Sequence, residues 1–122
     1  MLKKRMQRLQ YYGNSLPFAK VYFRTDWEVI YFELQGKMFA LMSPTPNEDA
    51  TLTVKGLPEK NEELREIYKD ISAGYHMNKK HWNSIALKSQ ILSDEELEQM
   101  LKLSYELVWK NLPAKIRKEL SD

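Results

Sequence analysis

Glu28-Val-Ile-Tyr-Phe-Glu-Leu-Gln-Gly-Lys-Met-Phe-Ala-Leu-Met-Ser43 is the part of this 122-residue sequence that indicates the fold most directly. It contains two runs, Glu28–Leu34 and Lys37–Ser43, that are rich in β-branched and aromatic residues. Only Gln35-Gly36 separates them, and a two-residue loop of this kind is typical of a β-hairpin. The sequence therefore predicts an antiparallel hairpin here.

The short loop also predicts how the two strands of the hairpin align. The expected opposite pairs are Phe32 with Phe39, Ile30 with Leu41, and Tyr31 with Ala40. Both faces of this hairpin are apolar, whereas an antiparallel sheet with one wet face alternates between apolar and polar residues. We therefore expect the second face to be covered as well, by a helix, a terminal segment or another subunit.

Further elements are expected on the C-terminal side of the hairpin. Thr51–Lys55 reads as a strand with Leu52 and Val54 pointing inward. Asn61 is expected to cap a helix that ends at residues 72–74, and its apolar stripe is Leu64, Ile67, Tyr68 and Ile71. A last strand is expected at Trp82–Leu87.

The long helix expected after Ser93 has unusually complete start signals. Ser93 and Glu96 fit a capping box, and Leu92 and Leu97 fit a hydrophobic staple. Its buried side is expected to carry Leu97, Met100, Leu101, Ser104, Tyr105, Val108 and Leu112. Pro113 interrupts this helix, and residues 114–120 are expected to form a short terminal helix.

The N-terminal segment reads as a basic amphipathic helix. Leu2, Met6 and Leu9 recur at helical spacing and are expected to face the core. The helix is expected to end at Gly13-Asn14, and a short strand is expected at Val21–Arg24. The other face of the helix carries Lys3, Lys4, Arg5 and Arg8.

Composition limits the class of protein. The chain has no cysteine, which excludes disulfides, thiolate metal sites and cysteine nucleophiles. No apolar run approaches the ~20 residues that a bilayer-spanning helix needs. We expect one domain over residues 1–122, no membrane association and a cytoplasmic location.

Charge is distributed unevenly along the chain, although the net charge is only +2. Residues 1–25 hold six basic side chains and no acidic one, whereas residues 26–74 hold five basic and ten acidic side chains. A basic arm of this kind is a hint of a polyanionic partner, but a solvated helix face is the more common explanation.

Tyr75–Leu87 contains both histidines, His76 and His81, together with a tryptophan and two adjacent lysines. Asn78 is expected to close a turn with its side chain, and Trp82 is expected to pack its ring against the last helix. A turn tip does not need cations, so Lys79, Lys80 and His81 are harder to explain as structure. Beside aromatic residues they have the composition that nucleic-acid surfaces favour.

These segments resemble the MmcQ/YjbR family of small bacterial proteins. The similarity is carried by Asn78–Trp82, by Gly36–Ala40, and by Ser104-Tyr105 with Leu112-Pro113, in order and at compatible spacing. Phe18 stands where that family often has glycine. The resemblance implies an α+β fold of two layers, an antiparallel β-sheet with helices packed against it, related to secretion-chaperone folds and described as double-wing. The family is often labelled DNA-binding, although a fold alone does not establish a function.

The sequence gives little sign of catalysis or of a cofactor. Neither histidine lies in a recognisable hydrolase or metalloprotease motif, and Ser104 has no nucleophile signature around it. A two-histidine metal site would need a third ligand such as Asp94 or Glu106, and nothing in the spacing indicates one. We expect no enzyme activity, no metal and no cofactor.

Two classes of binding function follow. The first is weak, non-specific binding of duplex DNA, with contacts from Lys3, Lys4, Arg5, Arg8, Asn78, Lys79, Lys80 and His81. The second is a protein-binding module, chaperone-like or homodimeric, that uses the apolar hairpin faces. If the cations of the N-terminal helix and of the turn share one face, the DNA hypothesis gains; if they scatter, the protein hypothesis is favoured.

Overall fold

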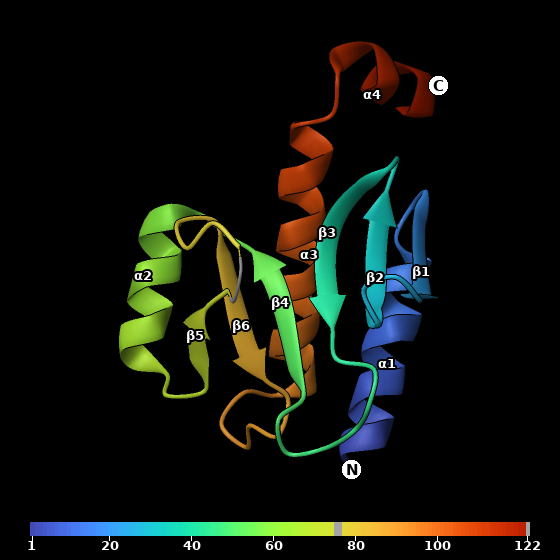
Figure 1. Cartoon of the computed structure of the whole chain (residues 1–122). Helices are drawn as coiled ribbons and strands as arrows, with labels where there is room; N and C mark the ends of the chain where they lie inside the picture. The colour runs from blue at the N-terminus through green and yellow to red at the C-terminus, as the bar shows by residue number, and fades with distance from the viewer. Residues whose placement is uncertain (75–76, 122) are drawn as a thin grey trace.

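Six strands form one antiparallel sheet in the order β1-β2-β3-β4-β6-β5, and helices pack against it (Figure 1). This computed structural model describes residues 1–74 and 77–121. The expectation of an α+β fold with an antiparallel sheet is confirmed. In chain order the elements are α1 (Leu2–Ser15), β1 (Ala19–Arg24), β2 (Val29–Leu34), β3 (Lys37–Met42), β4 (Thr51–Lys55), α2 (Pro58–Ile67), β5 (Ile71–Ala73), β6 (Trp82–Ala86), α3 (Asp94–Lys110) and α4 (Ala114–Ser121).

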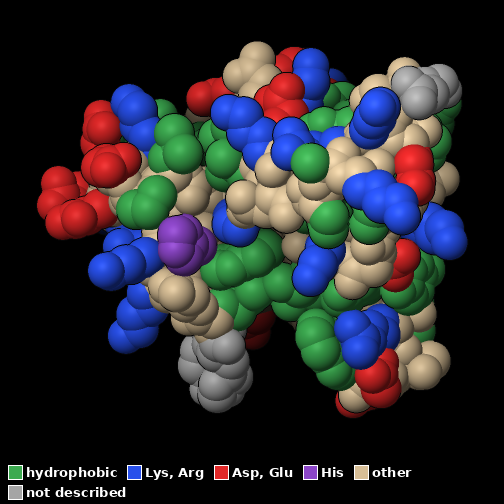
Figure 2. All heavy atoms as spheres, turned by 90° about the horizontal axis from the view of Figure 1, so that it is seen from above, with side chains coloured by type: hydrophobic (Ala, Val, Ile, Leu, Met, Phe, Trp, Pro, Cys, Tyr) green, Lys and Arg blue, Asp and Glu red, His purple; other side chains and the backbone are tan. Residues whose placement is uncertain are grey.

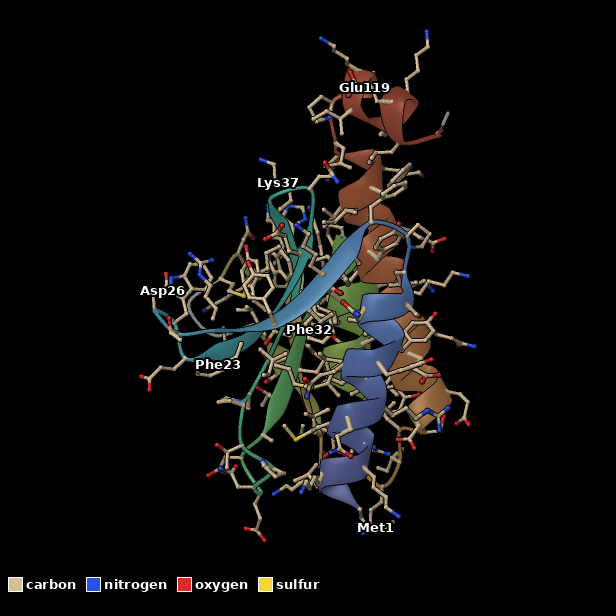
Figure 3. All side chains as sticks on the ribbon, turned by 90° about the vertical axis from the view of Figure 1, so that its right-hand side faces the viewer. Met1, Phe23, Asp26, Phe32, Lys37 and Glu119 are labelled. Carbon is tan, nitrogen blue, oxygen red and sulfur yellow. The ribbon has the colours of Figure 1, made fainter. Side chains whose placement is uncertain are left out.

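The core lies between one face of the sheet and the two helices α1 and α3. α3 contacts β2, β3 and β4, and α1 contacts β1 and α3. In the side view of Figure 3, Phe32 lies between the sheet and α1, whereas Asp26 lies on the far side of the sheet from α1. The fully buried side chains include Leu9, Phe32, Phe39, Leu52, Ile85, Leu97 and Leu101.

The β2–β3 hairpin is confirmed, but its predicted strand alignment is wrong. Gln35 and Gly36 have φ of 50° and 79°, the left-handed values that a tight hairpin turn requires. A β-bulge between Phe32 and Glu33 then shifts the register by one residue. The observed partners beyond the bulge are Ile30 with Met42, Tyr31 with Leu41, and Phe32 with Ala40, so the three predicted pairs are wrong.

Helix α1 ends at Ser15, one residue past the predicted Gly13-Asn14 stop. Gly13 lies inside the helix and is buried, and a Cβ there would come within 2.6 Å of the Phe32 ring. The glycine therefore permits close packing of α1 on β2 and does not act as a helix stop. Phe18, in the following loop, has φ of 65°, a conformation that favours glycine, and its ring stacks on Trp109.

Helix α2 and strand β5 differ from the prediction. α2 begins at Pro58, which is favoured in the first turn because it lacks an N–H. Asn61 is therefore not a cap but a buried residue of the helix interior. Ile71, expected on the helix, instead opens the short strand β5, which pairs with β6. Three residues are too few to give a strand signal of their own.

The sheet divides between β3 and β4. These strands pair only from Ala40 to Met42, and they diverge beyond that point (Figure 1). At the divergence the buried Ser104 hydroxyl of α3 donates to the Phe39 carbonyl and accepts a hydrogen bond of 2.8 Å from the Lys55 N–H. Ser104 therefore satisfies two backbone groups that the ladder no longer pairs.

The face of the sheet opposite α1 and α3 is not covered by any described helix (Figure 3). We call it the open face. Its central row of partners runs across all six strands, and directly opposed side chains project from the same face. The row consists of Tyr22, Tyr31, Leu41, Thr53, Ser84 and Ser72. The expectation that a helix or terminal segment covers this face is therefore wrong for the described chain.

The start of α3 provides a stability prediction. Ser93 Oγ accepts from the Glu96 N–H at 3.1 Å, and Glu96 accepts from the Ser93 N–H at 2.9 Å, so the predicted capping box is confirmed. We expect Ser93→Ala to lower the free energy of unfolding by about 1 kcal/mol. Urea denaturation measures this change, and coincident melts for the two proteins would contradict it.

Candidate binding surface

Arg5 of α1 is held by the segment that leads into α3. Its guanidinium donates to Asp94 Oδ1 at 2.7 Å and to the carbonyl oxygens of Leu87, Ser89 and Leu92 at 2.8 to 3.0 Å. These bonds use four of its five N–H groups. Arg5 was expected to contact phosphate. Its guanidinium instead joins α1 to the start of α3 and to the segment before it.

Arg8, one turn later on α1, also faces the acidic first turns of α3. Its guanidinium lies 2.8 Å from Glu98 and 3.4 Å from both Asp94 and Glu95. The hydrogen bond to Glu98 raises the pKa of Arg8, so the group stays charged. Lys3 and Lys4 are exposed on the same helix. Much of the positive charge of α1 is thus balanced inside the molecule.

The turn between β5 and β6 presents its cations to solvent. Asn78 Oδ1 accepts from the Lys80 N–H at 3.0 Å, which confirms that Asn78 closes the turn with its side chain. Lys79 and Lys80 are exposed, and His81 is half-buried. Tyr75 and His76 lie outside the described residues.

A buried polar network fixes this turn on α2. Asn61 Nδ2 donates to the Lys80 carbonyl at 3.0 Å, and Arg65 donates to the Lys79 carbonyl at 3.1 Å. Asn83 joins both residues, since its Oδ1 accepts from Arg65 at 2.8 Å and its Nδ2 donates to Asn61 Oδ1 at 3.3 Å. The sequence analysis missed this role for Asn61 and Asn83. No local signal marks either residue, since Asn61 stands among charged residues and Asn83 stands between Trp82 and Ser84.

The structure does not bring α1 and the 78–81 turn together. α1 begins at the lower end of the molecule in Figure 1, and the turn lies at the upper end beside the start of α2. The two groups of cations expected from the sequence therefore do not share one face. The separation therefore counts against a DNA surface that combines the cations of α1 with those of the turn, and it favours the protein-binding hypothesis over that version of the DNA hypothesis.

Other lysines accompany Lys79 and Lys80 at the upper end of the molecule. The β2–β3 turn, the start of β1, the end of β4 and α4 all lie at this end (Figure 1). Figure 2 looks down on it and shows Lys and Arg side chains over much of the surface, with acidic side chains mostly around the edges of the view. We call this the basic end; its cations include Lys20, Lys37, Lys55, Lys79, Lys80, Lys110, Lys115 and Lys118.

Part of the open face is hollowed. Figure 2 shows the hollow below the centre of the view, with hydrophobic side chains at its bottom. Tyr31 is only 7% exposed on this face because Tyr22, Trp27 and Arg24 pack against its ring. Thr53 and Ser84 are each 8% exposed. Thr53 and Ser84 satisfy each other through a hydrogen bond of 2.8 Å between their hydroxyls.

Trp82 belongs to the open face and not to the core under α3. It lies opposite Lys55 in the β4–β6 ladder, two residues from Ser84, while the intervening Asn83 is buried on the helix side. Its side chain is half-buried. The prediction that the ring packs against the last helix is therefore wrong, because the period of the strand places Trp82 on the opposite face.

An aromatic cluster with one arginine stands at the β1–β2 margin of the open face. Tyr31 lies 5.6 Å from Tyr22 and 5.7 Å from Trp27 between ring centroids. The Arg24 guanidinium lies 3.8 Å from the centroid of Trp27 and 4.8 Å from that of Tyr31. Its hydrogen bond of 2.9 Å with Asp26 lowers the pKa of Asp26 and raises the pKa of Arg24, so both stay charged.

The described residues offer no obvious catalytic or metal-binding arrangement. Over residues 1–74 and 77–121 no three His, Asp or Glu side chains gather as metal ligands would. Ser104 is fully buried and bonded to the backbone, as described above. None of the described helices is long and apolar enough to cross a membrane.

Comparison with known proteins gives a consistent result. The YjbR family model matches residues 14–107. The uncharacterized protein YjbR of Escherichia coli K12 is 28% identical over 115 residues, which cover 94% of this chain and 96% of that protein. The uncharacterized protein YbdF of Escherichia coli O157:H7 is 32% identical over 106 residues, 87% of this chain and 85% of that protein.

Solved structures share the fold. The crystal structure of Deinococcus radiodurans protein DR2400, described with a DUF419 domain, matches with a TM-score of 0.85 and 34% identity over 95% of this chain and 87% of that one. A Pseudomonas syringae protein matches with a TM-score of 0.69 over 83% of this chain and 96% of that one. At 23% identity the second likeness concerns the fold alone.

The different environments of the two α1 arginines yield a prediction. We expect Arg5→Ala to lower the free energy of unfolding by about 2–4 kcal/mol, because it leaves buried carbonyls and Asp94 without their donor. Arg8→Ala removes exposed ion pairs and should cost about 1 kcal/mol or less. Chemical denaturation of both variants measures the difference, and equal losses would show that Arg5 has no special structural role.

Proposed function

This chain belongs to the YjbR family, and we propose that it is a non-enzymatic binding module that holds duplex DNA weakly and without sequence preference. The family relatives compared above are named as uncharacterized proteins, so the proposal rests on this chain's own surface. The basic end is the surface we assign to the DNA. It keeps Lys79 and Lys80 from the sequence-based hypothesis and replaces α1 by other lysines.

The observation that carries the proposal is the set of solvent-facing lysines at the basic end. Lys20, Lys37, Lys79 and Lys80 are exposed, and none of them takes part in an ion pair within 4.0 Å among the described residues. Arg5 and Arg8, by contrast, are paired with acids of α3. Lysines without carboxylate partners are free to neutralise phosphates, and such contacts release counterions from DNA.

Phosphate contacts give affinity without sequence information. Lysine ammonium groups act as point charges and do not read base edges as a bidentate arginine does. The cations of the basic end also come from strand ends, a turn and α4, and not from one helix that could enter a groove. A dissociation constant of roughly 10⁻⁴ to 10⁻⁶ M at physiological salt follows for such non-specific binding.

A protein-binding module is the second candidate, because the open face offers an apolar surface. Trp27 is 52% exposed and Tyr22 is 41% exposed at the β1–β2 margin of this face. Exposed aromatic residues of this kind are common at protein interfaces. A homodimer formed through this face would also supply the cover that the apolar hairpin is expected to have.

The DNA proposal predicts a change in salt dependence. Replacing Lys79 and Lys80 together by Ala removes two phosphate contacts, so the log–log slope of affinity against salt should flatten by about two units. Fluorescence anisotropy of a labelled duplex across a salt series measures the slope. The far-UV circular dichroism spectrum should not change, since both side chains are exposed.

Lys3 and Lys4 form the matched control, because they are also adjacent and exposed but lie on α1. Their double replacement by Ala should leave the slope almost unchanged. A larger effect from Lys3 and Lys4 than from Lys79 and Lys80 would move the surface back to α1. Absence of any duplex binding at low salt would remove the DNA proposal and leave the protein-binding candidate.

The homodimer variant of the second candidate has its own test. If two copies pair through their open faces, light scattering at high micromolar concentration should give twice the 14.5 kDa mass of the chain. Trp27→Ala should then shift the mass toward the monomer. A monomer at every concentration would exclude this form of the second candidate.

A further inference from the structure

We propose that the open face binds single-stranded nucleic acid, with unpaired bases stacked on the aromatic cluster beside Arg24. This inference rests on the proposed function, because it states which form of nucleic acid, single-stranded or duplex, the same basic surface prefers. It adds a role for the hollow and its aromatic side chains, which duplex binding by lysines does not use.

The register of the sheet places the aromatic residues on one face. Tyr22 and Tyr31 belong to the central row of the open face, and Trp27 packs edge-on against Tyr31. Trp82 lies on the same face at the other side of the hollow, in the β4–β6 ladder. Aromatic rings therefore stand on both halves of the divided sheet, with Leu41 of β3 between them.

The rings near Arg24 are accessible from solvent. Trp27 is 52% exposed and Tyr22 is 41% exposed. Arg24 covers part of Trp27, but its guanidinium is itself a flat surface on which a base can stack. The ion pair with Asp26 orients that plane before any ligand arrives, so little side-chain freedom is lost on stacking.

Cations border this face where a backbone would pass. Lys20 lies on β1 two residues from Tyr22, and Lys55 lies opposite Trp82. Lys79 and Lys80 stand in the turn that leads into β6. Glu33 lies opposite Lys20 on this face, and the Tyr22 hydroxyl donates to it at 2.8 Å, which raises the pKa of Tyr22.

A single strand fits this combination better than a duplex. A duplex stacks its bases inside and presents phosphates and groove edges, so the apolar hollow would gain no partner. A single strand offers both phosphates for the lysines and exposed base faces for the rings. Stacking depends on the face of a base and not on its edge, so sequence preference should stay low.

Anisotropy titrations at one fixed salt concentration test the preference. The probes are a labelled oligonucleotide of about 12 nucleotides and mixed sequence, and the duplex formed with its complement. We expect the single strand to bind about tenfold more tightly than the duplex. Trp27→Ala should weaken single-strand binding about tenfold and leave duplex binding unchanged.

Tyr11→Ala is the matched control. Tyr11 is an aromatic residue of α1 that is 74% exposed, and it lies on the helix side of the sheet. Its replacement should change neither affinity. Equal losses from Trp27→Ala and Tyr11→Ala would overturn the inference, because they would show no special role for the open face.

Intrinsic fluorescence supplies a second measurement that does not need Trp27→Ala to fold well. Bases that stack on an indole quench its emission, and the chain has three tryptophans. Trp109 packs between Phe18 and Tyr105 on the helix side, so the quenching should come from Trp27 and Trp82. Trp27→Phe keeps an aromatic ring, and we expect it to retain binding while losing much of the quenching.

The outcomes separate this inference from the proposed function. Salt-dependent binding of both probes with equal affinity and without tryptophan quenching would overturn the stacking site and leave the DNA proposal standing. Failure of both probes to bind at low salt would remove both. Weak, salt-dependent duplex binding together with tighter single-strand binding that depends on Trp27 would support both; single-strand binding with no duplex binding would support this inference and remove the duplex proposal.

Discussion

The Ser104 hydroxyl lies where β3 and β4 diverge within the sheet. β3 and β4 pair over three residues, and beyond them the Phe39 carbonyl and the Lys55 N–H both turn to Ser104 of α3. A buried backbone group without a partner costs on the order of 1–3 kcal/mol. The helix therefore stabilises the place where the two strands diverge, from the side of the sheet opposite the open face. Lys55 of the candidate surface thus has its backbone held by the same buried side chain that bonds to Phe39.

Charge in this molecule has two different uses. Arg5 and Arg8 connect α1 to the acidic start of α3, and Arg5 also satisfies the carbonyls of the segment before that helix. The basic N-terminal segment suggested a polyanionic partner, but two of its arginines instead neutralise acidic side chains of α3. The lysines of the basic end have no such partners within the described chain. These lysines are proposed to bind a ligand because they lie together at one end of the molecule without acidic partners.

The open face combines features that no single segment carries. Arg24 comes from the end of β1, Trp27 from the β1–β2 turn, Leu41 from β3 and Trp82 from β6. Asn61 and Arg65 of α2 hold the turn that presents Lys79 and Lys80. A site of this kind is rigid where hydrogen bonds fix the backbone and adaptable where lysines extend into solvent. That division suits a module that binds a repetitive, charged ligand without reading its sequence.

Local patterns in the sequence were sufficient for much of this fold. The hairpin around Gln35-Gly36, the capping box at Ser93 and the asparagine turn at Asn78 depend on neighbouring residues, so each could be predicted from a short window. The bulge after Phe32, the strand β5 and the placement of Gly13 inside α1 depend on packing between distant segments, and they were not predicted. The residues of the candidate surface likewise fall into a group that could be predicted from the sequence and a group that could not. Lys79 and Lys80 could be recognised in the sequence, but only the tertiary structure paired Arg5 and Arg8 with α3 and moved Trp82 to the open face. The reason is physical: hydrogen bonding within a turn or cap is local, whereas burial and ion pairing depend on which remote segments the fold brings into contact.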